Sequence, residues 1–134
     1  MSLPDRKSQT SSQTVLLAED DPFMCELTSA WLQAHGYRVI ESVSGDLALP
    51  VLQAGGVDVL VTDIAMPGAL DGWALAVRAR TLHPQIVVVY LSSRPAIAAR
   101  QVRHSLYLQK PFHPDAIVAA IRQLTSWRGD GGEA

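Results

Sequence analysis

The chain has 134 residues, a formal net charge of −2, 48% hydrophobic residues and 18% charged residues. This length suits one domain with a sizeable core, and the composition is that of a soluble globular protein. No apolar run approaches the roughly 20 residues of a membrane span. The basic residues are not massed on one predicted helix, so we expect neither a membrane protein nor nucleic-acid binding. A single cysteine, Cys25, and the absence of a signal-peptide pattern favour the cytoplasm.

The two ends of the chain differ from the part between them. Residues 1–13 are polar and serine-rich, and residues 128–134 are glycine-rich and charged, which is typical of flexible tails. From residue 14 to residue 127, apolar runs alternate with segments of helical periodicity. This alternation predicts one α/β domain in which helices cover a parallel sheet.

Five apolar runs predict strands at residues 14–18, 37–41, 57–62, 86–91 and 106–108. The segments that follow them predict helices at about residues 23–34, 46–54, 72–82, 95–102 and 114–127. The count indicates a (βα)5, flavodoxin-like, doubly wound fold with five parallel strands. The fourth helix has little room, so we expect it to be short or remodelled.

Side-chain spacing within the helices gives three further expectations. In the first helix Phe23, Leu27 and Trp31 recur at helical spacing and are predicted to face the core. Pro50 lies inside the second helix and removes a backbone hydrogen bond, so that helix is expected to be short, kinked or irregular. Trp73 and Trp127 lie off the apolar stripes and could mark a partner surface.

Polar residues collect where the predicted strands end. Glu19 and Asp20 follow the first strand, Asp63 the third, Ser92 the fourth and Lys110 the fifth. Because parallel strands end at the same edge of a sheet, we expect these side chains on one rim. Carboxylates about 4 Å apart repel by roughly 4 kcal/mol per pair at an effective dielectric constant near 20, so a cation is required. Carboxylate oxygens without nearby histidine or cysteine suit Mg²⁺, or Mn²⁺ in its place, better than Zn²⁺.

A metal ion, an ammonium and a hydroxyl around one carboxylate are the components of a phosphoryl-transfer site. Asp63 would then be the nucleophile, and its product would be a high-energy aspartyl phosphate that suits a transient signal. Taken alone, Asp63 could equally end a strand in a turn. The acidic pair and Lys110 at matching strand ends favour the chemical role.

Four segments make the chain resemble the receiver domain of two-component response regulators over about residues 14–127. They are LLAEDDP, VLVTDIAMPGALDGW, VVVYLSS and YLQKPF, and each stands at a predicted strand end in the family's order. The resemblance implies that Asp63 accepts the phosphoryl group. It implies a metal site made by Glu19, Asp20, Asp63 and the backbone carbonyl of Ala65.

The resemblance also assigns the remaining residues of the rim. Lys110 would pair with the phosphoryl group, and the Lys110–Pro111 peptide bond is a candidate cis bond. Ser92 and Tyr107 would form the conformational switch, although Ser93 is an alternative to Ser92 and Tyr107 could be a plain core aromatic. Asp21 precedes Pro22 and is predicted to cap the first helix rather than to bind the metal.

By the same resemblance, the phosphoryl donor is the phosphohistidine of a sensor histidine kinase or of a phosphotransfer protein. Output would pass to a downstream protein or effector domain, and a homodimer is left open. The domain would be a signalling receiver that promotes its own phosphorylation and dephosphorylation, not an enzyme acting on other substrates. The chain could be a stand-alone protein or a receiver from a hybrid kinase or longer regulator.

Three departures from the family concern the loops and partner surfaces. The loop PGALDG is one residue longer than the commonest form, and the small apolar Ala65 stands two residues beyond the phosphoacceptor, a position that influences phosphoryl lifetime in the family. Only 17 residues separate Ser92 from Lys110, and Arg103-His104-Ser105 replaces the usual Gly-Ala. Partner geometry therefore does not transfer directly from the family.

Two other functions compete with the receiver. A haloacid-dehalogenase-like phosphohydrolase also uses a strand-end aspartate and Mg²⁺, but it requires a second acid two residues on, where Ala65 stands. A phosphorylation-independent, flavodoxin-like docking module would usually lose part of the acid, aspartate and lysine set, which is complete here.

Overall fold

The computed structural model describes residues 13–131 as a five-stranded sheet covered by helices. Residues 1–12 and 132–134 of the predicted tails lie outside the described residues, as does the side chain of Trp127. All strand pairs are parallel, in the order β2-β1-β3-β4-β5. The strands are β1 (Thr14–Ala18), β2 (Arg38–Ser42), β3 (Val59–Asp63), β4 (Val87–Ser92) and β5 (Ser105–Gln109).

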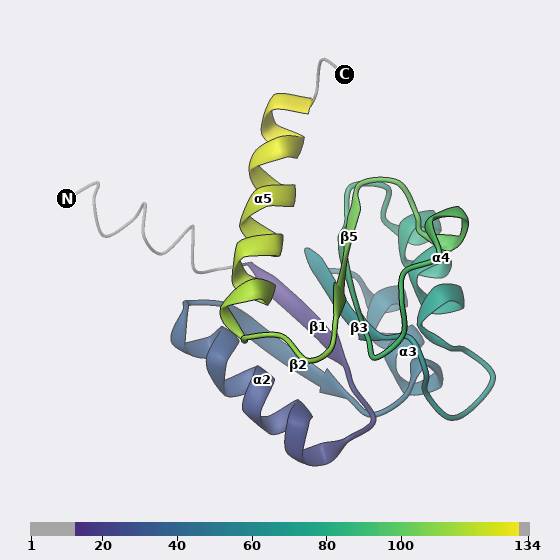
Figure 1. The fold of residues 1–134 in the computed structure, drawn as a ribbon. Coiled ribbons are helices and arrows are strands. Elements are labelled where there is room, and N and C mark those ends of the chain that lie inside the picture. The colour runs from purple at the N-terminus through teal and green to yellow at the C-terminus, as the bar shows by residue number, and fades with distance from the viewer. Residues whose placement is uncertain (1–12, 132–134) are drawn as a thin grey trace.

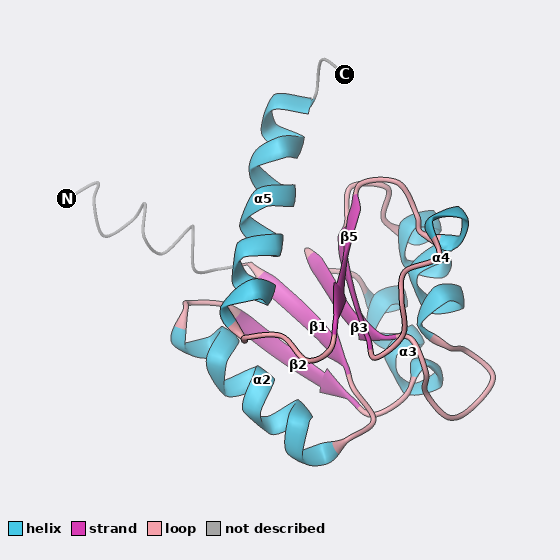
Figure 2. Cartoon of the chain, viewed as in Figure 1, coloured by secondary structure: helices cyan, strands magenta, loops and turns pink. Residues whose placement is uncertain are grey.

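Four α-helices cover the two faces of this sheet in the described part of the chain (Figure 1). They are α2 (Pro22–Ala34), α3 (Gly45–Ala54), α4 (Gly72–Leu82) and α5 (Asp115–Gly131). Helices α2 and α5 lie on one face, and α3 and α4 lie on the other (Figure 2). The predicted α/β class and five-stranded parallel sheet are confirmed. Helix α5 continues to Gly131, so residues 128–131 of the predicted tail are helical.

The central strands alternate their side chains between two cores, as the period of a strand requires. Val15 and Leu17 of β1 pack with α2 and α5, whereas Leu16 and Ala18 pack with α3 and α4. Strand β3 is buried along its whole length, as expected for a parallel sheet covered on both faces. This packing fixes the position of its last residue, Asp63.

The connection between β4 and β5 contains no α-helix. Its only helical element is a 3-10 turn, η1 (Ala98–Arg100), and residues 93–100 are all exposed. The prediction that the fourth helix is short or remodelled is confirmed. Two hydrogen bonds anchor the connection, because Val102 N donates to Tyr90 Oη at 3.0 Å and Tyr107 Oη donates to the Arg94 carbonyl at 2.7 Å.

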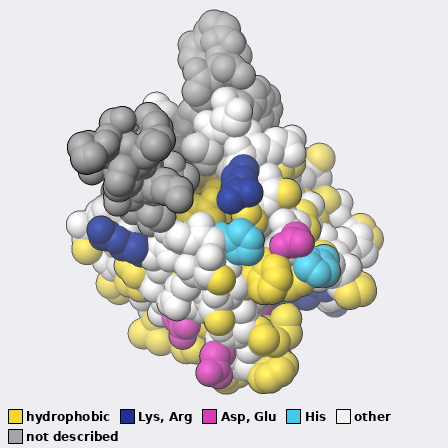
Figure 3. Space-filling model, turned by 90° about the vertical axis from the view of Figure 1, so that its left-hand side faces the viewer, with side chains coloured by type: hydrophobic (Ala, Val, Ile, Leu, Met, Phe, Trp, Pro, Cys, Tyr) yellow, Lys and Arg dark blue, Asp and Glu magenta, His cyan; other side chains and the backbone are white. Residues whose placement is uncertain are grey.

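The predicted core stripe of the first helix is wrong at two of its three residues, because only Trp31 packs, partly buried, against the core. Phe23 and Leu27 of α2 are 68% and 51% exposed, whereas Cys25 and Leu32 are buried. The helix therefore turns a mixed stripe of small, polar and apolar residues to the sheet, and leaves apolar side chains in solvent. Figure 3 shows hydrophobic side chains on the surface on this side of the molecule.

Two other expectations about helices have different outcomes. Trp73 is only 5% exposed, so the suggestion that it marks a partner surface is wrong. Its ring packs against Tyr90 and Tyr107, with centroid distances of 4.9 and 6.0 Å. Helix α3 continues without interruption through Pro50, whose side chain is exposed. None of the helices in residues 13–131 is long and apolar enough to cross a membrane.

Candidate functional site

The sheet continues slightly beyond its strands at the carboxyl edge, and this continuation positions the polar rim. Glu19 N donates to the Ser42 carbonyl at 2.9 Å, and Lys110 N donates to the Ser92 carbonyl at 2.7 Å. Ile64 N, directly after Asp63, donates to the Leu91 carbonyl at 3.0 Å. Backbone hydrogen bonds therefore hold the segments that carry the predicted acids and lysine. The Lys110–Pro111 peptide bond is cis.

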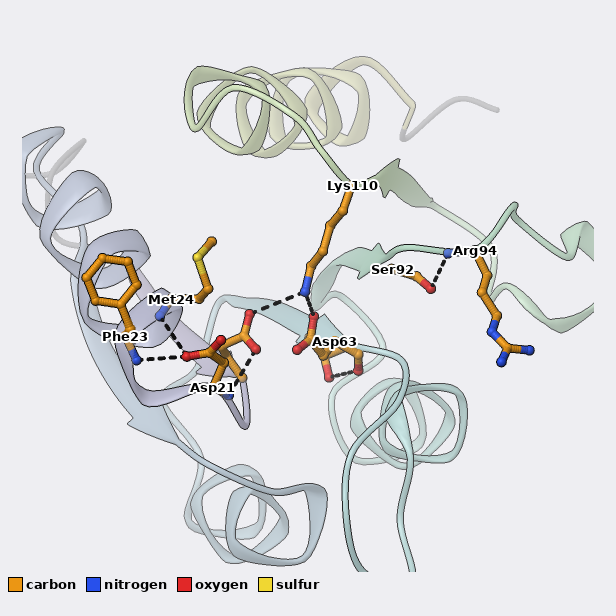
Figure 4. Close-up of polar contacts among 9 residues, drawn as sticks. Asp21, Phe23, Met24, Asp63, Ser92, Arg94 and Lys110 are labelled. Carbon is orange, nitrogen blue, oxygen red and sulfur yellow. Dashed lines mark hydrogen bonds and ion pairs between the residues drawn. The ribbon is translucent and has the colours of Figure 1, made fainter.

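The ammonium of Lys110 lies between Asp63 and Glu19 of the acidic pair. Asp63 Oδ1 is 2.9 Å from Lys110 Nζ, and the same ammonium is 3.7 Å from Glu19 Oε1 (Figure 4). Asp63 and Glu19 are buried, whereas the lysine side chain is 32% exposed. One ammonium thus faces two buried carboxylates, and this leaves an excess of negative charge at the rim.

Burial and the neighbouring charges together shift the pKa values of Glu19 and Lys110. Burial, followed by the hydrogen bond and negative charge of Asp63, raises the pKa of Glu19 from 4.5 to about 8. Burial alone would lower the pKa of Lys110, but the hydrogen bond and charge of Asp63, with Glu19, raise it above its ordinary value. Glu19 therefore holds a proton at neutral pH unless another cation joins the cluster.

Three carboxylates at the rim have the geometry of a cation site. Oxygens of Glu19, Asp20 and Asp63 lie within 4.8 Å of one another, with Asp20 exposed and the other two buried. A hard oxygen set of this kind fits Mg²⁺ or Mn²⁺, which keep several water ligands. Besides burial, the hydrogen bond and negative charge of Asp63 raise the pKa of Glu19, and a bound cation would oppose both effects.

Asp21 has a separate role, and its predicted function as a helix cap is confirmed. Its Oδ1 accepts hydrogen bonds from Phe23 N at 3.0 Å and Met24 N at 3.3 Å, at the first turn of α2 (Figure 4). Its own backbone N donates to Glu19 Oε2 at 3.2 Å. The residue that caps α2 therefore also positions the carboxylate of Glu19.

Ser92 and Tyr107 both contact the same residue in the β4–β5 connection. Ser92 Oγ accepts a hydrogen bond from Arg94 N at 3.1 Å, and Tyr107 Oη donates to the Arg94 carbonyl. Ser92 lines a pocket of about 310 Å³ together with the acids and the lysine, as does Ser93. Tyr107 is half-buried and does not line this pocket. Arg94 therefore links the two predicted switch residues.

Asp46 is a site-supporting residue that the sequence did not reveal. Its carboxylate accepts hydrogen bonds from Ala69 N at 3.1 Å and Leu70 N at 3.0 Å, in the loop between β3 and α4. Gly68 in that loop has φ +97°, and a Cβ there would lie 2.5 Å from Asp46 Oδ2. The longer loop is thus fastened to the first turn of α3, and it carries Ala65 into the pocket wall.

The fold and the rim together define a doubly wound α/β domain with a lysine and two further acids around one strand-end aspartate. A family model described as the response regulator receiver domain matches residues 15–122, and the chain belongs to this family. Members are signalling modules of two-component systems rather than a classical enzyme family.

Individual relatives support the same membership. The chain is 33% identical over 114 residues to the response regulator receiver protein CpdR of Brucella abortus, covering 82% of this chain and 94% of that protein. It is 33% identical over 115 residues to the response regulator GtcR of Aneurinibacillus migulanus, covering 83% of this chain and 47% of that protein. The chain thus spans about half the length of GtcR.

A solved structure gives the same picture in three dimensions. The crystal structure of a response regulator receiver protein from Sinorhizobium medicae matches with a TM-score of 0.84 and 33% sequence identity. The match covers 87% of this chain and 97% of that chain. The receiver fold is therefore shared over almost the whole described range.

Proposed function

We propose that this chain is a phosphoacceptor receiver that takes a phosphoryl group from a partner's phosphohistidine onto Asp63. The observation that carries the proposal is the buried Asp63 carboxylate 2.9 Å from Lys110 Nζ, in a pocket that the acidic pair and Ser92 also line. Receiver domains of this family pair with sensor kinases and effector domains, which makes a protein the natural donor.

The proposed transfer forms one bond and breaks one. An Asp63 carboxylate oxygen attacks the phosphorus, the new O–P bond forms, and the P–N bond of phosphohistidine breaks. The imidazole leaves with that electron pair and becomes neutral by taking a proton from solvent. Lys110 would pair with the phosphoryl oxygens. Mg²⁺ or Mn²⁺, held by Glu19, Asp20, Asp63 and the Ala65 carbonyl, would supply positive charge to the transferring group.

The surface beside the pocket suits a protein donor. Asp21 lines the pocket and caps α2, and the next turns of that helix expose Phe23 and Leu27. Exposed apolar side chains on one helix favour contact with another helix. We propose that the donor docks over this end of α2, in the cytoplasm, where the sensor kinase presents its phosphohistidine.

The proposed switch uses contacts that already hold the β4–β5 connection. If the phosphoryl group draws Ser92 Oγ toward Asp63, Arg94 N loses its acceptor. Tyr107 Oη, which is bonded to the Arg94 carbonyl, would then change its partner as well. Phosphorylation shifts the population only as far as these contacts differ in free energy between the two states.

The direct test is incubation with acetyl phosphate and Mg²⁺, followed by intact mass spectrometry. We expect wild-type protein to gain the mass of one phosphoryl group and the Asp63→Asn variant to gain none. Chelation of the metal should remove the gain in wild type. A gain that persists in Asp63→Asn, or one that is independent of metal, would contradict the proposal.

A second prediction separates the two neighbouring aspartates. Asp20→Ala is expected to weaken Mg²⁺ binding at least tenfold, because it removes an oxygen of the three-carboxylate cluster. Asp21→Asn should bind Mg²⁺ almost as wild type does, because asparagine also caps helices and Asp21 bonds to α2. Isothermal titration calorimetry measures both affinities. Equal losses in the two variants would refute the division of roles.

A further inference from the structure

Charge is divided unequally between the two halves of the domain. The segment from Gly72 to Pro114 contains no aspartate or glutamate. Its basic residues are Arg78, Arg80, Arg94, Arg100, Arg103 and Lys110. From Gln13 to Asp71 the pattern is reversed, because Arg38 is the only basic residue there among many acids. A net charge of −2 therefore hides a basic half and an acidic half.

Two of the basic residues are used inside the fold, and the others are exposed. Arg80 donates to the carbonyls of Ile86 and His104, at 2.8 and 3.1 Å, and to that of Arg103. Lys110 faces Asp63. The exposed arginines are Arg78, Arg94, Arg100 and Arg103. Four guanidinium groups therefore remain available to solvent in a region without carboxylates of its own.

Three of these arginines lie on the β4–β5 connection, which packs beside α4 (Figure 1). The guanidinium carbon of Arg100 is 5.2 Å from the centre of the Trp73 ring, and this contact places η1 against the start of α4. The Arg80 contacts fasten residues 103 and 104 to the other end of the same helix. Figure 4 shows the Arg94 side chain extending away from the Asp63–Lys110 pair.

Two exposed apolar side chains come from the same two elements, the β4–β5 connection and α4. Ile97, at the start of η1, is 50% exposed, and Val77, one turn after Trp73 on α4, is 51% exposed. We call Val77, Arg94, Ile97, Arg100 and Arg103 the basic surface. It combines positive charge with aliphatic side chains, and a partner must satisfy both.

We propose that the basic surface is a docking site for an acidic protein segment that carries an aliphatic anchor residue. Arginine binds carboxylates in a planar, two-point geometry, and its weak hydration favours such contacts at interfaces. The aliphatic anchor would cover Ile97 and Val77. Nucleic acid fits less well, because the acidic half of the domain repels a polyanion and the apolar side chains have no role against phosphates.

The location of the surface gives it a regulatory connection, which rests on the proposed function. Arg94 belongs to the surface, while its backbone N bonds to Ser92 Oγ and its carbonyl accepts from Tyr107. A change at either switch residue therefore moves one arginine of the docking site directly. We expect the affinity for the acidic segment to differ between the phosphorylated and unphosphorylated protein.

The test uses a fluorescein-labelled peptide of glutamate, aspartate and leucine, with a matched peptide in which glutamine and asparagine replace the acids. Fluorescence anisotropy at physiological salt should show binding of the acidic peptide only. The double variant Arg100→Glu and Arg103→Glu should weaken it at least tenfold, and Ile97→Ser should weaken it severalfold. The control, Arg38→Glu and Arg122→Glu, makes the same charge change elsewhere and should bind nearly as wild type does.

Several outcomes would overturn the docking proposal. They are no binding by wild type, equal losses in the two double variants, and tighter binding of a short DNA duplex than of the peptide. Thermal melts check that each variant is folded, and Ile97→Ser keeps the test valid if the charge reversal unfolds the protein. Intact mass verifies phosphorylation separately, so failure of the proposed function is recognised independently. Equal affinity before and after verified phosphorylation would overturn only the link to Ser92 and Tyr107.

Discussion

Replacing Gly72 with alanine is expected to destabilise the domain by about 3 kcal/mol or more. A Cβ at this position would lie 2.1 Å from the Asp63 carbonyl oxygen and 2.7 Å from Ile64 Cα. Both neighbours are backbone atoms at the end of β3, so no side-chain rotation can relieve the overlap. Alanine favours a helix over glycine by only about 1 kcal/mol, and the steric cost therefore decides the sign.

The contact at Gly72 also explains how α4 begins so close to Asp63. Gly72 N donates to the Ile64 carbonyl at 2.7 Å, which ties the first turn of α4 to the chain that leaves β3. An alanine would push the helix away from Asp63, and the site would lose its geometry along with its stability.

Urea unfolding of Gly72→Ala and Gly56→Ala gives the measurement and its control. Gly56 has φ +88°, and a Cβ placed there would have no atom within 4 Å. Alanine at this position is therefore destabilised by its backbone conformation alone, without a steric clash. We expect a loss of about 1 kcal/mol for Gly56→Ala and a clearly larger loss for Gly72→Ala. If the two variants had similar urea midpoints and similar m-values, the backbone around Gly72 would have moved to accommodate the Cβ, and the predicted clash would be wrong.

The sequence predicts this sheet well because strand and rim follow from local patterns. Uninterrupted apolar runs indicate strands buried on both faces, and β3 and β4 have that burial. Polar residues that stop such runs must lie at the carboxyl edge, which is where Asp63 and Ser92 are found. Lys110 could be placed beside Asp63 for the same reason, without knowledge of any distance.

Features that depend on how elements pack were not predictable in the same way. The orientation of α2 exposes Phe23 although its spacing is that of a core residue. Trp73 was expected off the apolar stripe of its helix, but it is buried because Tyr90 and Tyr107 reach it from β4 and β5. The clamp by Asp46 joins residues more than twenty positions apart. Predicting such contacts requires the order of the strands in the sheet and the path of the loops, and neither can be read from a local stretch of sequence.

Loss of the Lys110 ammonium is expected to destabilise the metal-free protein in a pH-dependent way. Lys110→Met keeps much of the side-chain volume but leaves Glu19 and Asp63 without their cation. Removing one partner of a buried ion pair costs about 3–5 kcal/mol, and the partial exposure of Lys110 reduces this to about 1–3 kcal/mol. We expect the loss to grow as the pH rises above 8, where Glu19 of the wild type is ionised, and to be smaller near pH 6.

The sign of the pH dependence follows from the pKa of Glu19. In the folded protein it is raised from 4.5 to about 8, so between these values the folded state binds a proton that the unfolded state has released. Stability therefore falls as the pH rises through this window. Without the lysine, the folded-state pKa of Glu19 rises further. The pH range over which the free energy of unfolding falls therefore extends above pH 8.

Thermal melts of wild type and Lys110→Met across this pH range test the argument. Adding Glu19→Gln to Lys110→Met should restore most of the stability lost at about pH 9, because it removes one of the two buried carboxylates whose ionised form the lysine stabilises. Mg²⁺ should stabilise Lys110→Met more than wild type, since the ion then supplies the missing positive charge. If Lys110→Met lost the same stability at pH 6 and at about pH 9, the lysine would be acting through packing of its alkyl chain, and the electrostatic account of the rim would be wrong.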